Sequence, residues 1–251
     1  MNNYFNPFSL QGKNILVTGA SSGIGRGIAI SCAKMGAYII INGRNISRLK
    51  KTQEIIGEGN STLEVCDLND TNEVTKMVEN LPKLDGIVHC AGIIQRMLAK
   101  QVKEFDVNMI MDTNFKAPII LQSLLLQKKK INKNASIVFI ASLSANSPNI
   151  GNCLYSASKG AIISYANCLM AELAPRKIRV NCISPAMVWT DLVHDNLVTE
   201  EQLIADEQRY PLKRYGKPED IAYLAIYLLS DASSWMTGNN INITGGVTIL
   251  Y

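Results

Sequence analysis

The sequence predicts one α/β domain built on a doubly wound sheet of about seven parallel strands flanked by helices. The main observation is that short apolar runs alternate along the chain with longer amphipathic segments. The apolar runs are nearly continuous, which is typical of strands buried on both faces of a parallel sheet. With 251 residues, of which 47% are hydrophobic and 18% charged, the chain can bury one sizeable core without a metal or disulfide staple.

The apolar runs and the amphipathic segments follow one another in regular order. The predicted strands are 14–18, 38–41, 63–66, 86–90, 136–140, 179–183 and 240–243. The predicted helices are 25–35, 47–56, 73–79, 109–127, 156–173 and 218–229. No internal repeat, low-complexity tract or linker separates these elements, so we expect a single domain over residues 1–251.

Charge and cysteine usage argue against several classes of function. The net charge is +4, and the dense basic run at 128–130 suits a helix C-terminus better than a nucleic-acid patch. The six cysteines form no C-x-x-C pair and no metal-ligand spacing with the two histidines, so we expect no metal and a reducing compartment. Residues 1–10 are too short and polar for a signal peptide, and no apolar run reaches the ~18 residues of a membrane span. We therefore expect a cytoplasmic protein that binds neither membranes nor nucleic acid.

A glycine-rich turn follows the first predicted strand and precedes the first helix. It comprises Thr18, Gly19, Ala20, Ser21, Ser22, Gly23, Ile24 and Gly25. Gly19 lets the chain turn tightly, Gly23 lets the backbone approach a pyrophosphate, and Gly25 allows close packing of helix on strand. The helix N-terminus directs free N–H groups at the anion. The alternative is a tight turn that binds no ligand.

The end of the second strand indicates which dinucleotide is bound. A carboxylate about 20 residues past the glycines normally holds the ribose 2′-OH of NAD. Residues 41–45 contain no acid but do contain Arg44, whose guanidinium suits a 2′-phosphate. We therefore expect NADP(H) rather than NAD(H); the alternative is that Arg44 lies in a solvated turn without a ligand.

Ser142, Tyr155 and Lys159 form the candidate catalytic group. Tyr155 and Lys159 are four residues apart at the start of a long apolar helix, so their side chains share one face. An ammonium beside a phenol stabilises phenolate, so we expect Lys159 to lower the pKa of Tyr155. Ser142 follows a predicted strand, at the edge where doubly wound folds bind ligands. Without this context, Tyr155 and Lys159 would be an ordinary surface pair.

Together these residues resemble the short-chain dehydrogenase/reductase family over essentially the whole chain. The glycine spacing G-x-x-x-G-x-G and the Ser/Tyr/Lys set carry the resemblance. Further matching pieces are 10–13, 66–68, 91–92, Asn114, 179–181, 184–185, 216–220, 237–238 and 245–246. The family implies a single-domain, Rossmann-like fold.

The resemblance also implies roles for individual residues. Tyr155 would be the general acid in carbonyl reduction, Ser142 would hydrogen-bond the substrate carbonyl, and Lys159 would hold the nicotinamide ribose. Asn114 would support a water in the proton relay. Asp67 and the backbone of Leu68 would hold the adenine, and Thr190 the carboxamide. The full set of expected cofactor-binding residues is Gly19, Ser21, Ser22, Gly23, Ile24, Gly25, Arg44, Asp67, Leu68, Cys90, Ala91, Gly92, Tyr155, Lys159, Pro185, Val188 and Thr190.

Two positions depart from the family pattern. The usual N-N-A-G reads His89-Cys90-Ala91-Gly92, which replaces an amide by a thiol, and the usual Pro-Gly reads Pro185-Ala186. Neither departure removes a catalytic group. We expect His89 to be a packed histidine rather than a catalyst.

The expected activity is an NADP(H)-dependent oxidoreductase that transfers a hydride between nicotinamide and a carbonyl or secondary alcohol. Similarity favours members that reduce 3-oxoacyl thioesters on acyl-carrier protein, and sugar or polyol dehydrogenases are the alternative. A more remote alternative is a non-catalytic dinucleotide-binding sensor or scaffold. Substrate choice is expected in a lid at about 189–214, which includes Trp189, Leu192, His194, Leu197 and Tyr210. The apolar tail at 247–251 predicts a homo-oligomer, most simply a tetramer.

Overall fold

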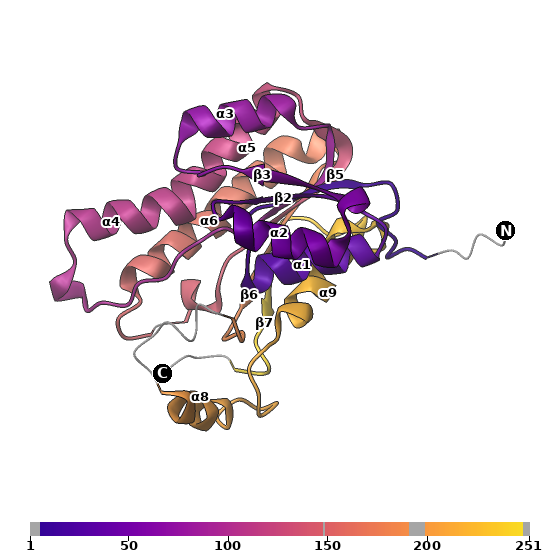
Figure 1. Cartoon of the computed structure of the whole chain (residues 1–251). Helices are drawn as coiled ribbons and strands as arrows, with labels where there is room; N and C mark the ends of the chain where they lie inside the picture. Colours follow the sequence, from indigo (N-terminus) through magenta and orange to yellow (C-terminus); the bar gives the residue numbers. More distant parts are fainter. Residues whose placement is uncertain (1–5, 148, 191–198, 248–251) are drawn as a thin grey trace.

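The protein is described by a computed structural model that covers residues 6–147, 149–190 and 199–247. Its centre is a seven-stranded parallel sheet with strand order β3-β2-β1-β4-β5-β6-β7 (Figure 1). The strands are β1 Asn14–Val17, β2 Tyr38–Gly43, β3 Ser61–Val65, β4 Leu84–His89, β5 Ile131–Ile140, β6 Arg179–Pro185 and β7 Asn240–Ile243. The predicted doubly wound α/β sheet is therefore confirmed. The order reverses between β1 and β4, and such a switch point is where open α/β sheets bind ligands.

The helices cover both faces of the sheet (Figure 1). They are α1 Gly23–Lys34, α2 Ile46–Ile56, α3 Thr71–Asn80, α4 Glu104–Met111, α5 Ala117–Gln127, α6 Cys153–Leu173, α8 Glu200–Glu207 and α9 Pro218–Leu229. One buried core joins the sheet to α3, α5 and α6, and a second joins it to α1 and α9. Within β1, Leu16 packs into the first core while Ile15 and Val17 pack into the second. Both faces of a strand are thus buried, which explains the continuous apolar runs.

The structure differs from the predicted elements in the middle of the chain. The predicted helix 109–127 is two α-helices, α4 and α5, joined by a π-helical turn over Asp112–Lys116. The strand predicted at 136–140 begins at Ile131, because the chain pairs with β4 at Leu84, shifts register and pairs again from Gly86. The sequence did not indicate this longer strand, because residues 132–134 are polar and Asn134 has φ 64°.

Helix α8 was not predicted, although its sequence carries a helix-start signal. Thr199 and Gln202 form a capping box, in which the Thr199 hydroxyl accepts from the Gln202 N–H and the Gln202 side chain accepts from the Thr199 N–H. Buried Leu203, Tyr210 and Tyr215 form a small third core beside Trp189. Figure 1 shows α8 apart from the sheet layers.

Parts of two predictions concern residues that the structure does not describe. Leu192, His194 and Leu197 of the expected lid, and 248–251 of the apolar tail, lie outside the described residues. In the ranges that the structure does cover, no helix is both long enough and apolar enough to cross a membrane.

Candidate active site

A cavity of about 560 Å³ lies at the carboxyl ends of β1, β4, β5 and β6. It joins the glycine-rich turn to the start of α6, so two regions far apart in sequence share one wall. The predicted site residues that line it are Gly19, Ser22, Gly23, Ile24, Gly25, Cys90, Gly92, Ser142, Tyr155, Lys159, Pro185, Val188 and Thr190. The predicted residues outside its lining are Ser21, Arg44, Asp67, Leu68, Ala91 and Asn114.

The glycine-rich turn is shaped by two close approaches. Gly19 has φ +67°, and a Cβ there would lie 2.9 Å from the Cα of Ala91. Gly23 has φ +51°, and a Cβ there would lie 3.1 Å from the Thr190 methyl group. The Thr18 hydroxyl accepts from the backbone N–H groups of residues 90 and 91, at 3.0 and 3.1 Å, and fastens the turn to the end of β4. The turn thus forms a cradle of exposed backbone, which we call the glycine cradle, and side chains at Gly19 or Gly23 would crowd it.

The first turn of α1 faces this cradle. Helix α1 begins at Gly23, and residues 23–25 line the cavity. The first N–H groups of a helix have no partner within the helix, so they provide donors and positive potential for an anion. No acidic residue occupies this first turn to compete for those donors. The cradle and the helix end therefore fit a dinucleotide pyrophosphate.

Ser142 and Tyr155 meet at the centre of the cavity. Ser142 follows β5 in an extended conformation, and its hydroxyl accepts from the Ser144 N–H at 3.2 Å. Burial raises the pKa of Tyr155 above its ordinary value, and a hydrogen bond from Ser142 offsets only part of that rise. The phenol therefore stays protonated at neutral pH.

Lys159 lies one helical turn after Tyr155 but is held elsewhere. Its Nζ donates to the carbonyl oxygen of Ile140 at 2.9 Å and lies 5.7 Å from the centre of the Tyr155 ring. Burial lowers the pKa of Lys159 to about 8. The expected lowering of the Tyr155 pKa by Lys159 is wrong for this geometry, because the loss of hydration around the phenol outweighs any influence of the ammonium.

Asn114 lies behind the catalytic group rather than in the cavity wall. The π-helical turn buries it, and its amide exchanges two hydrogen bonds with the backbone of Ile93, at 2.8 and 2.9 Å. Its Nδ2 also donates to the Ser158 hydroxyl, which in turn donates to the carbonyl oxygen of Tyr155 at 2.7 Å. Asn114 thereby ties the loop after β4 to the helix that carries Tyr155 and Lys159. π-helical turns are rare and often occur at functional sites.

The expected adenine-side residues lie outside the cavity lining, with Arg44 exposed and Asp67 and Leu68 half-buried. The Arg44 guanidinium lies 3.7 Å from the Asp67 carboxylate, and about two-thirds of the Arg44 side chain is exposed. Asp67 also accepts from the backbone N–H of Asn69. The sequence interpretation missed Arg48, which does line the cavity. Its position, four residues after Arg44 and in the first turn of α2, was the available signal.

His89 and Cys90, at the end of β4, lie in different environments. The His89 ring stacks on Phe139, with centroids 4.5 Å apart, and its Nε2 hydrogen-bonds the Gln122 side chain at 3.0 Å. Burial lowers the pKa of His89 to about 4, so the ring is a neutral core residue, as expected. Cys90 lines the cavity, and burial raises the pKa of its thiol to about 12. The thiol is therefore neutral and a poor nucleophile.

The remaining cavity wall contains polar residues that the sequence analysis did not single out. They are Arg96, Asn149, Asn152, Gln202, Asp206 and Arg209. Arg209 pairs with Asp206 at 3.1 Å. Asn152 is 3% exposed and lies three residues before Tyr155, a spacing that places both on one side of the start of α6.

Comparison with known proteins gives consistent matches over nearly the whole chain. A family model described as "Enoyl-(Acyl carrier protein) reductase" matches residues 19–248. The 3-oxoacyl-[acyl-carrier-protein] reductase of Rickettsia felis is 36% identical over 241 residues, 96% of this chain and 99% of that protein. A solved structure titled "putative gluconate dehydrogenase", from Agrobacterium tumefaciens, has a TM-score of 0.90 and 28% identity, covering 98% of this chain and 100% of that one. A "putative NAD(P) dependent gluconate 5-dehydrogenase" from Beutenbergia cavernae, solved with NADP at low occupancy, has a TM-score of 0.87 and 31% identity, covering 96% and 98%.

Proposed function

Because this chain belongs to the short-chain dehydrogenase/reductase family, and so is an NAD(P)-dependent oxidoreductase acting on CH–OH and C=O groups, we propose that it is an NADP(H)-dependent ketone reductase. The observation that carries the proposal is that one cavity joins Ser142, Tyr155 and Lys159 to a glycine cradle suited to a dinucleotide. A sensor or scaffold would need the cradle but not the proton-carrying group.

The residues divide the chemistry between them. When bound, NADPH supplies the hydride that reduces the carbonyl carbon. The Tyr155 phenol supplies the proton to the carbonyl oxygen, since its raised pKa keeps it protonated, and solvent then replaces that proton. The Ser142 hydroxyl donates a hydrogen bond to the same oxygen as negative charge develops on it. Lys159, with its charge buried beside Ile140, is positioned to hold the ribose hydroxyls.

Tyr155→Phe tests this assignment. The variant keeps the ring and should fold and bind NADPH, but it should lose ~10²- to 10⁴-fold in kcat because no proton is transferred. Tyr165→Phe is the matched control, since Tyr165 lies in the same helix but packs against the core outside the cavity. If Tyr155→Phe keeps more than half of the wild-type kcat, Tyr155 is not the general acid.

We further propose that Arg44 and Arg48 together favour NADPH over NADH. Arg48 lines the cavity together with the glycine-rich turn, Arg44 directly follows β2, and β2 ends without an acid that could accept from a free 2′-hydroxyl. A charge-assisted bond to the 2′-phosphate at an exposed site should contribute roughly 10-fold in affinity. Arg44→Asp should reverse the preference, whereas Lys50→Asp, a change at an exposed position of the following helix α2, should not. An unchanged NADPH/NADH ratio of kcat/KM in Arg44→Asp would remove Arg44 from this role.

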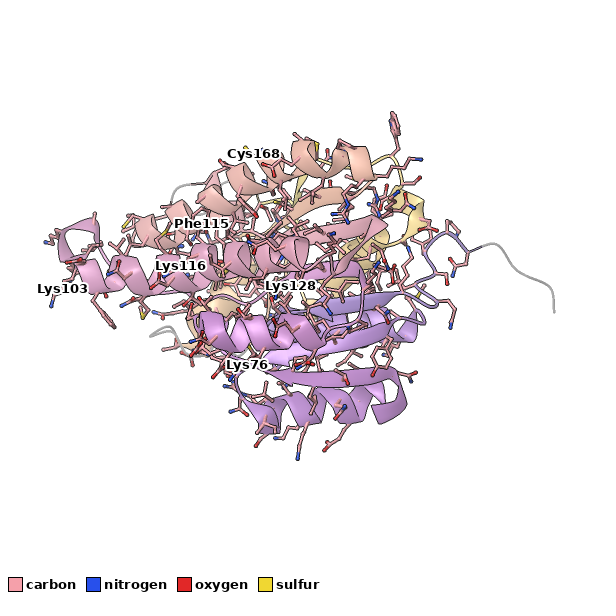
Figure 2. The ribbon with its side chains drawn as sticks, turned by 90° about the horizontal axis from the view of Figure 1, so that it is seen from above. Lys76, Lys103, Phe115, Lys116, Lys128 and Cys168 are labelled. Carbon is pink, nitrogen blue, oxygen red and sulfur yellow. The ribbon has the colours of Figure 1, made fainter. Side chains whose placement is uncertain are left out.

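Two substrate classes are supported by different observations. The 36%-identical reductase supports a 3-oxoacyl thioester, whereas the gluconate dehydrogenase matches and the polar side chains within the mixed cavity wall support a hydroxylated sugar acid. Figure 2 shows Lys103, Lys116 and Lys128 spread along α4 and α5 rather than gathered into one patch. Lys116 pairs with Asp112 and Lys128 pairs with Glu79, so part of this charge is already balanced. The polar side chains in the mixed cavity wall favour the hydroxylated substrate.

The assembly and the location of the protein are also proposals. We propose that α8 and its flanking segments act as the substrate lid, because Leu203, Gln202 and Tyr210 line the cavity from that side. We propose a homotetramer, because α9 and the turn before β7 expose two large aromatic side chains, Tyr223 at 65% and Trp235 at 100%. A reduced, cytoplasmic setting is supported by the absence of disulfides among the described cysteines.

A further inference from the structure

We infer that Asn152 is a specificity-determining residue that binds a substrate hydroxyl next to the reacting carbonyl, and that the substrate is a polyhydroxylated keto carboxylate whose carboxylate binds Arg96. This inference rests on the proposed function and names its substrate class. It is carried by one buried amide whose Oδ1 has no partner and by one cation without a carboxylate partner among the described residues, both in the lining of the cavity that holds Tyr155.

Asn152 is a buried polar side chain that the fold itself does not use. It is 3% exposed, and its Oδ1 is buried without a hydrogen-bond partner among the described residues. It precedes the first residue of α6, yet its side chain does not cap the helix. Buried amides are normally hydrogen-bonded, because an unmet group costs ~1–3 kcal/mol. An amide oxygen without a hydrogen-bond partner, in a residue that lines a cavity, is therefore a candidate to bind a ligand.

The position of Asn152 fixes what part of the substrate it would meet. Asn152, the residue before α6, lies three positions before Tyr155, and Ser142 lines the same cavity. The carbonyl that Tyr155 protonates must lie between the Tyr155 and Ser142 hydroxyls. We place the substrate atoms bonded to that carbonyl next to Asn152, because Asn152 lines the same cavity and lies near Tyr155 in the chain. An amide can both donate to and accept from a hydroxyl, whereas a methylene group would leave it unmet.

Arg96 supplies a cation at the same end of the cavity. The loop that carries it is fastened to the segment before Asn152, because the Met97 N–H donates to the carbonyl oxygen of Gly151 at 2.8 Å. A Cβ on Gly151 would lie 3.9 Å from the Cβ of Arg96, so the two segments are in direct contact. Among the described residues no carboxylate pairs with Arg96, in contrast to Arg209, which pairs with Asp206. A guanidinium at a cavity mouth suits a substrate carboxylate.

The pair of side chains discriminates between the two substrate classes. A site built to hydrogen-bond a hydroxyl rejects an analogue without it, because its own polar groups are then left unpaired. The alkyl chain of a 3-oxoacyl thioester would press methylene groups against Asn152 and offer no carboxylate to Arg96. A keto sugar acid offers both groups. The geometry thus favours sugar acids over acyl thioesters in the same catalytic centre.

Four ketones separate the contributions of the two residues when each is reduced with NADPH. They are 5-ketogluconate (hydroxyls and carboxylate), fructose (hydroxyls only), 4-oxopentanoate (carboxylate only) and ethyl acetoacetate (neither). Asn152→Leu, of similar volume, should lower kcat/KM roughly 10-fold for the two hydroxylated ketones, mainly through KM, and leave the other two unchanged or improved. Arg96→Met should lower kcat/KM by a similar factor for the two carboxylates only. The matched controls, Asn146→Leu and Lys100→Met, change exposed residues outside this cavity.

The outcomes separate this inference from the catalytic assignment. Binding of 5-ketogluconate to NADPH-loaded Tyr155→Phe enzyme, measured by calorimetry, should weaken roughly 10-fold when Asn152→Leu is added. If wild type reduces none of the four ketones and no acyl thioester, the proposed function fails. If wild type prefers ethyl acetoacetate or acetoacetyl thioesters to 5-ketogluconate, the substrate class is wrong. If Asn152→Leu lowers all four rates equally, Asn152 is a structural residue without a role in specificity.

Discussion

His89 provides a sharp test of the energetics of the core, because it is a titratable group buried without a charged partner. The ring is 4% exposed, stacks on Phe139 and hydrogen-bonds Gln122. Its pKa falls from 6.5 to about 4 in the folded protein, and burial is the first cause. The unfolded chain therefore binds more protons than the folded one between these two values, so stability is lost as pH falls through this window.

The size of the effect follows from the two pKa values. The neutral ring costs the folded state little at pH ~7, about 2 kcal/mol at pH ~5, and about 3 kcal/mol once the pH is below ~4. His89→Asn removes the titrating group and puts an amide in its place. We expect the variant to be less stable than wild type near neutral pH, because it loses the stacking on Phe139, but to lose less stability on acidification.

The measurement is urea denaturation of wild type and His89→Asn at fixed protein concentration, at pH ~7 and pH ~5. The other titrating groups, chiefly carboxylates, are the same in both proteins. The difference between the two pH dependences of the unfolding free energy therefore isolates His89. We expect this difference to be about 2 kcal/mol in favour of the variant. Equal pH dependences would show that His89 is not held neutral by burial, and the reasoning would be refuted.

Three further predictions concern the turn, the proton carrier and the assembly. Gly19→Ala should destabilise the fold by at least ~1–2 kcal/mol in thermal denaturation, because Gly19 has a positive φ and lies close to the backbone of Ala91. Gly160→Ala, in open space on α6, should stabilise the fold slightly, and equal effects of the two substitutions would contradict the close approach. Carbonyl reduction should keep a constant kcat with rising pH and fall only when the phenol of Tyr155 titrates, above its ordinary pKa of about 10, whereas alcohol oxidation should accelerate with pH below that point. Parallel pH profiles in the two directions would exclude Tyr155 as the shared group. Light scattering should give about four times the 27.6 kDa chain mass, and Trp235→Asp should lower it; a wild-type mass near one chain would contradict the tetramer.

The sequence predicted the sheet because its strands are buried on both sides. Each core strand contributes alternate residues to two separate cores, so the apolar runs are long and unambiguous. It also predicted the residues that gather at the strand ends, since Gly19, Ser142 and Tyr155 have characteristic spacings. It could not predict the direction of the Tyr155 pKa, because hydration around the phenol depends on the assembled cavity. Asn152 was missed for the same reason: an amide before a helix looks like a cap until its partners are known.

The π-helical turn at Asp112–Lys116 has a consequence for how this chain tolerates length changes. In an α-helix each residue advances the direction of the side chains by about 100°, so one residue too many or too few rotates everything after it. The wide turn absorbs one extra residue between α4 and α5, which lets Asn114 face the catalytic helix while Leu121 and Leu125 keep facing the sheet. Deleting a single residue here would force the two helices into one continuous register. Either Asn114 would turn away from Ser158, or the leucines of α5 would leave the core.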